Sequence, residues 1–160
     1  MRNSLKNILF IVFVSIISLG LYQYYQNYNE ARSFNNFLDS AALVSSLHLE
    51  ASEEFKNLLD FSEISREDFE NKIDKVVSNS KEAYEIINNT DSSLTLKEKE
   101  LLSLATSYWL QGLEMFEVSI MTLIDNPNSE KIQQSIAQSI SDLSIGDRSY
   151  SEFLFLTKQN

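Results

Sequence analysis

Hydrophobic residues recur three and four positions apart along most of the chain after residue 27. Because an α-helix completes a turn about every 3.6 residues, this spacing gathers them on one side of a helix. Short segments rich in Ser, Asn and Asp separate the periodic stretches. The pattern therefore predicts four amphipathic helices, over about residues 27–60, 65–88, 96–124 and 129–157. No Pro or Gly lies between residues 21 and 65, so the first helix can continue directly from the segment before it.

Local sequence signals mark where some of these helices begin or end. Residues 65–68 and 95–98 resemble capping boxes, in which a Ser or Thr and an acidic residue three positions later satisfy free backbone amides. Pro127 cannot continue a helical hydrogen-bond ladder, so the third helix is expected to end shortly before it. The resulting helices are long and the connections between them are short.

Long helices joined by short loops pack as antiparallel neighbours. We therefore expect an all-α fold in which residues 27–160 form an antiparallel up-down-up-down four-helix bundle. In that arrangement, the loop around residues 88–93 and the carboxyl terminus lie at the end of the bundle nearest residue 27. The loops near residues 61 and 127 lie at the opposite end.

A different pattern marks residues 1–26, where apolar positions are continuous rather than periodic. The apolar run covers residues 8–21, and no charged residue lies between Lys6 and Glu30. A membrane-spanning helix needs roughly 20 residues, and the tyrosines after the run supply the amphipathic rings of an interfacial belt. These tyrosines are Tyr22, Tyr24, Tyr25 and Tyr28. The sequence predicts an N-terminal transmembrane helix.

Basic residues before the run indicate its orientation. Arg2 and Lys6 favour the cytoplasmic side of the membrane. We therefore expect a single-pass protein of the cell membrane, anchored in the lipid bilayer, with a cytoplasmic N-terminus and an extracytoplasmic domain from residue 27 to 160. A cleaved signal peptide is the competing interpretation, since Ser18 and Gly20 supply small residues at the end of the run. A buried helix of a soluble protein is less well supported, because such a helix is usually amphipathic.

Charge and composition exclude several classes of function. The chain has 23 Asp and Glu against 13 Lys and Arg, a net charge of −10, and no nucleic-acid partner is expected because phosphate binding needs clustered basic residues. With no cysteine and one histidine, the chain has no disulfide framework, thiolate metal site or histidine cluster. Three glycines and one proline are too few for the many tight turns of an all-β fold.

The sequence contains no recognisable catalytic or cofactor-binding motif. A Gly-x-Ser-x-Gly turn, a Gly-rich phosphate loop and the Glu-x-x-His pairs of di-iron bundles are all missing. Acidic residues are dense between Glu50 and Asp74, but they lack the spacing of a calcium-binding loop and are interpreted as a solvated face. We therefore expect neither an enzyme nor a bound cofactor or metal.

Four residues are candidates for a ligand or partner surface: His48, Tyr108, Trp109 and Phe116. His48 lies in the centre of the apolar stripe of the first predicted helix. There it is a core histidine bonded to a neighbouring helix, a histidine turned to the rim of the bundle, or a pH-sensitive switch. The three aromatic residues belong to the wide apolar face of the third predicted helix. They either pack as an ordinary core or line a cavity for a small ligand between helices.

The apolar face of the third predicted helix is wider than usual. Leu110, Val118 and Met121 fall outside its main stripe, which indicates either a central place in the bundle or a contact with a partner. From this face and the anchor we expect a membrane-tethered protein-interaction or assembly module that binds another envelope protein or a second copy of the chain. The alternative is a sensor-like module that binds a small ligand in the bundle core. The layout is similar to that of the extracytoplasmic sensor modules of bacterial chemoreceptors, a likeness of architecture alone.

Overall fold

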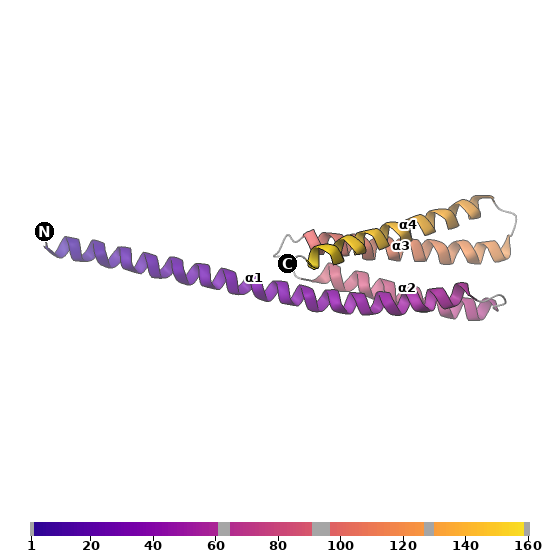
Figure 1. The fold of residues 1–160 in the computed structure, drawn as a ribbon, viewed down its shortest axis with the longest axis horizontal. Coiled ribbons are helices and arrows are strands. Elements are labelled where there is room, and N and C mark those ends of the chain that lie inside the picture. The colour runs from indigo at the N-terminus through magenta and orange to yellow at the C-terminus, as the bar shows by residue number, and fades with distance from the viewer. Residues whose placement is uncertain (1, 61–64, 91–96, 127–129, 159–160) are drawn as a thin grey trace.

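Four helices make up the described chain, which confirms the all-α fold. The computed structural model describes residues 2–60, 65–90, 97–126 and 130–158, with the side chains of residues 2–16 and of Glu130 left aside. The helices are α1 (Arg2–Leu59), α2 (Arg66–Asn89), α3 (Lys97–Asp125) and α4 (Glu130–Thr157). Each of α2, α3 and α4 begins and ends next to the residues that the hydrophobic pattern indicates (Figure 1).

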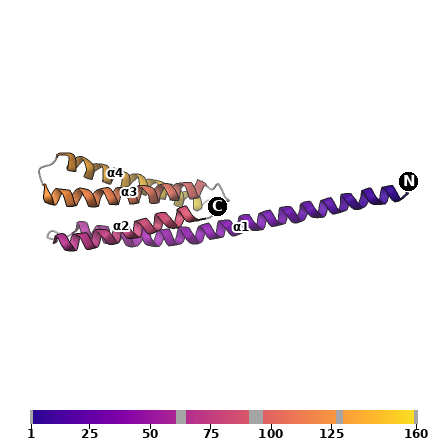
Figure 2. The same ribbon diagram turned by 180° about the vertical axis from the view of Figure 1, so that it is seen from behind.

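The first helix is longer than the bundle. α1 runs without a break through 58 residues, so the amphipathic helix predicted from about residue 27 continues directly from the segment before it. α1 contains no proline, and its single glycine, Gly20, does not end it because a helix interior tolerates one glycine at a modest cost. Described side chains are exposed from Ile17 to Arg32, and burial starts at Ser33. The first half of α1 therefore extends beyond the bundle (Figures 1 and 2).

Within the part of the chain that the structure describes, no helix combines the length and the apolarity that crossing a lipid bilayer requires. The apolar run that predicts the anchor begins at Ile8, and its side chains as far as Ile16 lie outside the described ones. The transmembrane helix, its orientation and its cleavage therefore stay predictions from the sequence.

The start of α2 is capped as its sequence indicates. Ser65 has an extended backbone, with φ −67° and ψ 154°, and its side chain accepts a hydrogen bond from the backbone amide of Asp68 at 3.1 Å. Such a cap satisfies one of the backbone amides that the first turn leaves free. The second expected capping box, at residues 95–98, begins outside the described residues, as does the helix stop at Pro127.

The helices run antiparallel in sequence order and form two closely packed pairs. α1 lies beside α2, and α3 lies beside α4, with the most extensive packing in the second pair (Figures 1 and 2). α2 and α3 connect the two pairs. The bundle architecture predicted from short loops and long helices is therefore confirmed, and α1 and α4 form its least closed seam.

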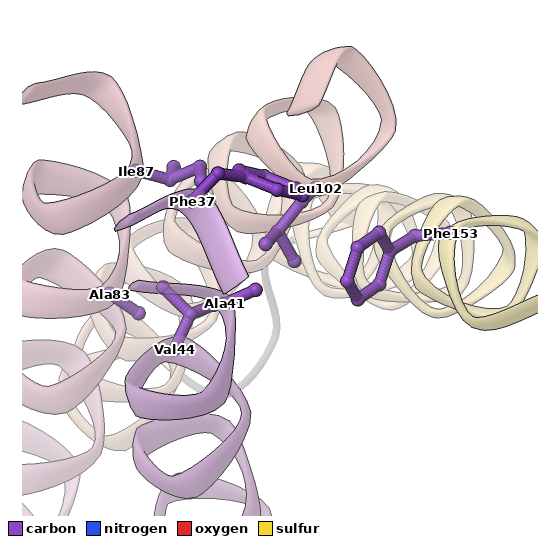
Figure 3. Close-up of a cluster of buried hydrophobic side chains, with 7 residues drawn as sticks. All are labelled: Phe37, Ala41, Val44, Ala83, Ile87, Leu102 and Phe153. Atoms are coloured by element: carbon purple, nitrogen blue, oxygen red, sulfur yellow. The ribbon is translucent and has the colours of Figure 1, made fainter. Parts of the chain in front are cut away.

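Two clusters of buried side chains form the core. We call the first cluster, which Figure 3 shows, the Phe37 core. It consists of Phe37, Ala41, Val44, Ala83, Ile87, Leu102 and Phe153. The cluster that we call the Phe116 core consists of Ala51, Leu58, Phe69, Ile73, Val76, Leu113 and Phe116. All four helices contribute to the first. In the second, α4 contributes only the half-buried Ile136 and Leu143.

Candidate functional site

A cavity of about 240 Å³ lies in the bundle core beside both clusters. Its lining residues come from all four helices: His48, Ala51, Ser52, Phe55, Lys56 and Leu59 of α1, Val76, Ser80 and Ala83 of α2, Trp109 and Leu113 of α3, and Leu143 and Asp147 of α4. Most of these side chains are apolar, and the polar ones are few. Such a composition is typical of small-molecule sites.

One end of the cavity is formed by two stacked rings. The imidazole of His48 lies parallel to the indole of Trp109, with ring centroids 3.4 Å apart and planes within 7°. The two residues belong to α1 and α3, so the stack joins the two helix pairs across the core. A flat, rigid aromatic wall of this kind complements a planar or apolar ligand surface.

The indole of Trp109 is held in place from α4. Its Nε1 donates a hydrogen bond to Oδ1 of Asp147 at 2.9 Å. Close approach of α3 and α4 at this level depends on Gly146, because a Cβ there would lie 2.5 Å from Cδ1 of Trp109. The glycine thus leaves room for the indole, and the carboxylate next to it in the sequence fixes the orientation of the ring.

Tyr150 of α4 packs against the rings of both His48 and Trp109. Its hydroxyl donates to Oγ of Ser45 at 2.9 Å, and its ring centroid lies 5.2 Å from that of Trp109 and 5.5 Å from that of His48. On its other side it contacts Phe153 of the Phe37 core, at 5.8 Å between centroids. The aromatic end of the cavity is therefore continuous with the closed part of the bundle.

His48 is held in its neutral form by its surroundings. Burial lowers the pKa of His48 below its ordinary value of 6.5, and the carboxylate of Asp147 opposes this shift without cancelling it. Burial disfavours the charged imidazolium because a low-dielectric interior solvates charge poorly. At neutral pH the imidazole is therefore uncharged, with Oγ of Ser52 3.4 Å from its Nε2.

The cavity opens toward solvent along the α1–α4 seam. Among its lining residues, Ser52, Lys56 and Leu59 of α1 are exposed, and so is Asp147 of α4. Lys56 forms no ion pair with any residue that the structure describes. The mouth therefore carries a cation that is available for an external group.

The floor of the cavity contains a hydroxyl group without a protein partner. Ser80 is 4% exposed and lines the cavity from α2, yet it makes no hydrogen bond to any described residue. Other helical serines, such as Ser45 and Ser149, donate to the carbonyl four residues earlier. The hydroxyl of Ser80 is therefore available as a hydrogen-bonding point for a molecule inside the cavity.

The structure brings two of the four expected site residues together. His48 and Trp109 stack at the cavity, whereas Phe116 packs in the Phe116 core with its ring centroid 5.1 Å from that of Phe55. Tyr108 is half-buried and does not line the cavity. That these residues bind a ligand stays a prediction. Of the four, His48 and Trp109 are the two that line the cavity.

Sequence reasoning missed the contributions of Asp147, Lys56 and Ser80 to the site. Asp147 directly follows a glycine on the apolar face of α4, which was a usable signal for a side chain close to a neighbouring helix. Ser80 lies in the apolar stripe of α2 between Val76 and Ala83, which indicates a buried hydroxyl but not a cavity. Lys56 carried no such signal, because its place at the cavity depends on the other helices.

Two acidic residues of α1 form ion pairs with a lysine of α2. Nζ of Lys75 lies 3.1 Å from Glu50 and 2.9 Å from Glu54, which joins α1 to α2. The described residues include no group of three or more His, Cys, Asp or Glu side chains arranged to hold a metal ion.

On the α2–α3 side of the bundle, burial and the carboxylate of Asp74 raise the pKa of Glu117.

Comparisons with family models, curated proteins and solved structures find no match for this chain.

Proposed function

We propose that this chain is a sensor-like module that binds a small, largely apolar molecule between its four helices. The supporting observation is the cavity of about 240 Å³ with the stacked His48 and Trp109 at one end. Protein interiors are close-packed and contain few voids larger than a water molecule. Apolar cavities of about 150 Å³ accept a benzene-sized molecule, so this cavity has room for a substituted single ring.

Binding at this position would also join the two helix pairs. The cavity lies between α1 and α2 on one side and α3 and α4 on the other, and its mouth follows the α1–α4 seam. A ligand that contacts Phe55 and Leu143 would bridge this seam, because these residues belong to α1 and α4. The proposed readout is therefore a change in how closely α4 approaches α1.

We further propose that α1 tethers the module to the cell membrane, with the bundle outside. Support comes from the apolar run at residues 8–21 and from the exposed tyrosines between Tyr22 and Tyr28 on the part of α1 that lies beyond the bundle. Resistance of the full chain to alkaline extraction from membranes would support the tether. Release into the soluble fraction with the N-terminus intact would exclude it, and the mass of the native protein would reveal cleavage.

Trp109 provides a direct assay for the cavity because it is the single tryptophan of the chain. We expect the neutral probe benzyl alcohol to change its fluorescence saturably in the full chain held in lipid nanodiscs. The substitution Ala51→Leu should abolish the change by filling the cavity. Ala41→Leu is the matched control, since both alanines are on α1 and 4% exposed but Ala41 does not line the cavity. An equal response from both variants would exclude binding in the cavity.

A second candidate function is the interaction module, favoured by apolar side chains on the outside of α3. Val118 is 65% exposed and Leu104 is 45% exposed, and about four helical turns separate them on the same side of the helix. Leu110 and Met121 are half-buried, so the exposed strip is narrower than the sequence indicates. Crosslinking of the full chain in membranes should give a dimer that Val118→Lys weakens. Recovery of monomers alone would exclude self-association through this face.

A further inference from the structure

The charged groups around the cavity are not equivalent. Asp147 already accepts the indole hydrogen of Trp109, so its place in the site is structural. His48 is stacked and uncharged at neutral pH. Lys56 and Asp147 are the two charged lining residues, and neither forms an ion pair with a described residue. The carboxylate of Asp147 is engaged by the indole, whereas the ammonium group of Lys56 makes no hydrogen bond to a described residue. Lys56 is therefore the charged group that is available to a ligand.

The positive and negative groups lie at different ends of the cavity. Lys56 follows His48 by eight residues in the same helix, which at about 1.5 Å per residue places them roughly 12 Å apart along the helix axis. Asp147 lies at the His48 end because it binds the indole that stacks on His48. Charges farther apart than the Debye length of about 8 Å are largely screened at physiological salt. An anion beside Lys56 is therefore little affected by Asp147.

Nearby acidic residues leave Lys56 available. Glu50 and Glu54, on the same stretch of α1, are paired with Lys75 of α2. Glu53 and Asp60 lie one helical turn from Lys56, and neither is within ion-pair distance of it in the structure. The long, flexible lysine stem can also bring its ammonium group over the mouth while its methylene groups cover apolar surface.

We propose that the cavity binds a small carboxylate with an apolar body, and that Lys56 holds its carboxylate at the mouth. The body would occupy the apolar space lined by Phe55, Leu113 and Leu143. A charge-assisted hydrogen bond from an ammonium group to a carboxylate is stronger than a neutral one. This assignment rests on the proposed ligand-binding function and adds the chemical class of the ligand.

The test compares three probes that share a phenyl body: phenylacetate, phenylacetamide and phenethylamine, which are anionic, neutral and cationic at neutral pH. Each is titrated against the full chain in nanodiscs of uncharged lipid, with Trp109 fluorescence as the readout. We expect phenylacetate to bind about tenfold more tightly than either of the other two, as the strength of a charge-assisted hydrogen bond implies. Lys56→Gln should remove this preference and leave the affinity for phenylacetamide unchanged.

The control variant is Lys81→Gln, which removes an exposed lysine of α2 that does not line the cavity. It should retain the full preference for phenylacetate. Equal affinity for the three probes, a preference for phenethylamine, or a preference that survives Lys56→Gln would overturn the ligand class while the cavity remains a binding site. Failure of all three probes to bind would instead overturn the proposed function together with the ligand class.

Discussion

The two ends of the bundle use α4 in different ways. In the Phe37 core, Phe153 of α4 is 3% exposed and meets Phe37 of α1 edge to face, with centroids 6.2 Å apart (Figure 3). In the Phe116 core, α4 supplies only the half-buried Ile136 and Leu143. The α1–α4 seam is therefore closed by an aromatic pair at one end. Toward the other end it opens into the cavity.

This difference shows how one fold combines a stable part with a binding part. A packed aromatic pair fixes α1 and α4 at the Phe37 core, and the cavity begins one helical turn further along, beyond Tyr150. The closed end can hold the helices together while side chains at the open end remain free to adapt to a ligand. Local differences in packing of this kind usually coincide with differences in local stability.

The largest effect is expected from removing the aromatic pair. Phe153→Ala should lower the free energy of unfolding by about 3–5 kcal/mol, the usual cost of deleting a buried phenylalanine ring. Urea unfolding followed by far-ultraviolet circular dichroism measures the change. Phe155→Ala, at a position that is 61% exposed, should have almost no effect. Similar decreases in the free energy of unfolding for Phe153→Ala and Phe155→Ala would contradict the tight packing of α4 in the Phe37 core.

Enlarging an alanine should change the free energy of unfolding differently in the two regions. Ala41→Leu adds volume to the packed Phe37 core and should lower the free energy of unfolding by about 1–3 kcal/mol. Ala51→Leu extends into the cavity and should cost clearly less, or stabilise the protein, because the added atoms fill empty space. The same urea titration compares the two. A larger decrease in the free energy of unfolding for Ala51→Leu than for Ala41→Leu would mean that the cavity cannot accept a leucine side chain.

A methyl group at Gly146 should disturb the aromatic end of the cavity. The new Cβ would lie 2.5 Å from the indole of Trp109, so the ring must move and its hydrogen bond to Asp147 is strained. We expect Gly146→Ala to lower the free energy of unfolding by about 1–2 kcal/mol and to shift the Trp109 emission spectrum. Gly20→Ala, where nothing lies within 4 Å of the added group, should leave the spectrum unchanged.

The smallest effect is a dependence on pH that arises at His48. Its pKa is lowered in the folded protein by burial, so below about pH 6.5 the unfolded chain binds more protons than the folded one. The His48 contribution to stability is thus complete above the unfolded pKa and is lost as the pH falls toward the folded pKa. His48→Gln should remove this part of the pH dependence in urea titrations.

Glu117 is present in both proteins, so its raised pKa cancels when wild type and His48→Gln are compared. The difference between their unfolding free energies should therefore be constant above neutral pH and change only on acidification. A difference that stays constant on acidification would show that His48 titrates equally in the folded and unfolded chain.

The sequence predicted the secondary structure because the relevant signals are local. The stripe that contains Phe69, Ile73 and Val76 specifies a helix through its own spacing, and the Ser65 cap is formed within four residues of chain. No helix boundary lies at residue 27, because nothing local ends the helix there. α1 continues from Arg2 to Leu59, and a change of environment along a helix does not require a break in it.

The candidate site was only partly predictable. The aromatic character of the third helix pointed to Trp109, and the position of His48 in an apolar stripe pointed to its burial, but neither pattern revealed that the two rings stack. Phe116 and Tyr108 carried the same signal as Trp109 and lie away from the cavity. Which aromatic residue lines a cavity depends on how each helix is positioned along its axis relative to its neighbours. That relative position cannot be inferred from the sequence of one helix.

The sequence by itself determined that the chain forms long amphipathic helices and that they pack as antiparallel neighbours. It also determined that the chain has no cysteine and a single histidine. Only the tertiary structure decided that α4 closes on α1 at Phe153 and leaves a cavity beside Trp109. Helix formation depends on contacts three and four residues apart, which a sequence displays directly. A cavity depends on how side chains of four separate helices fill the space between them, and that is a property of their packing.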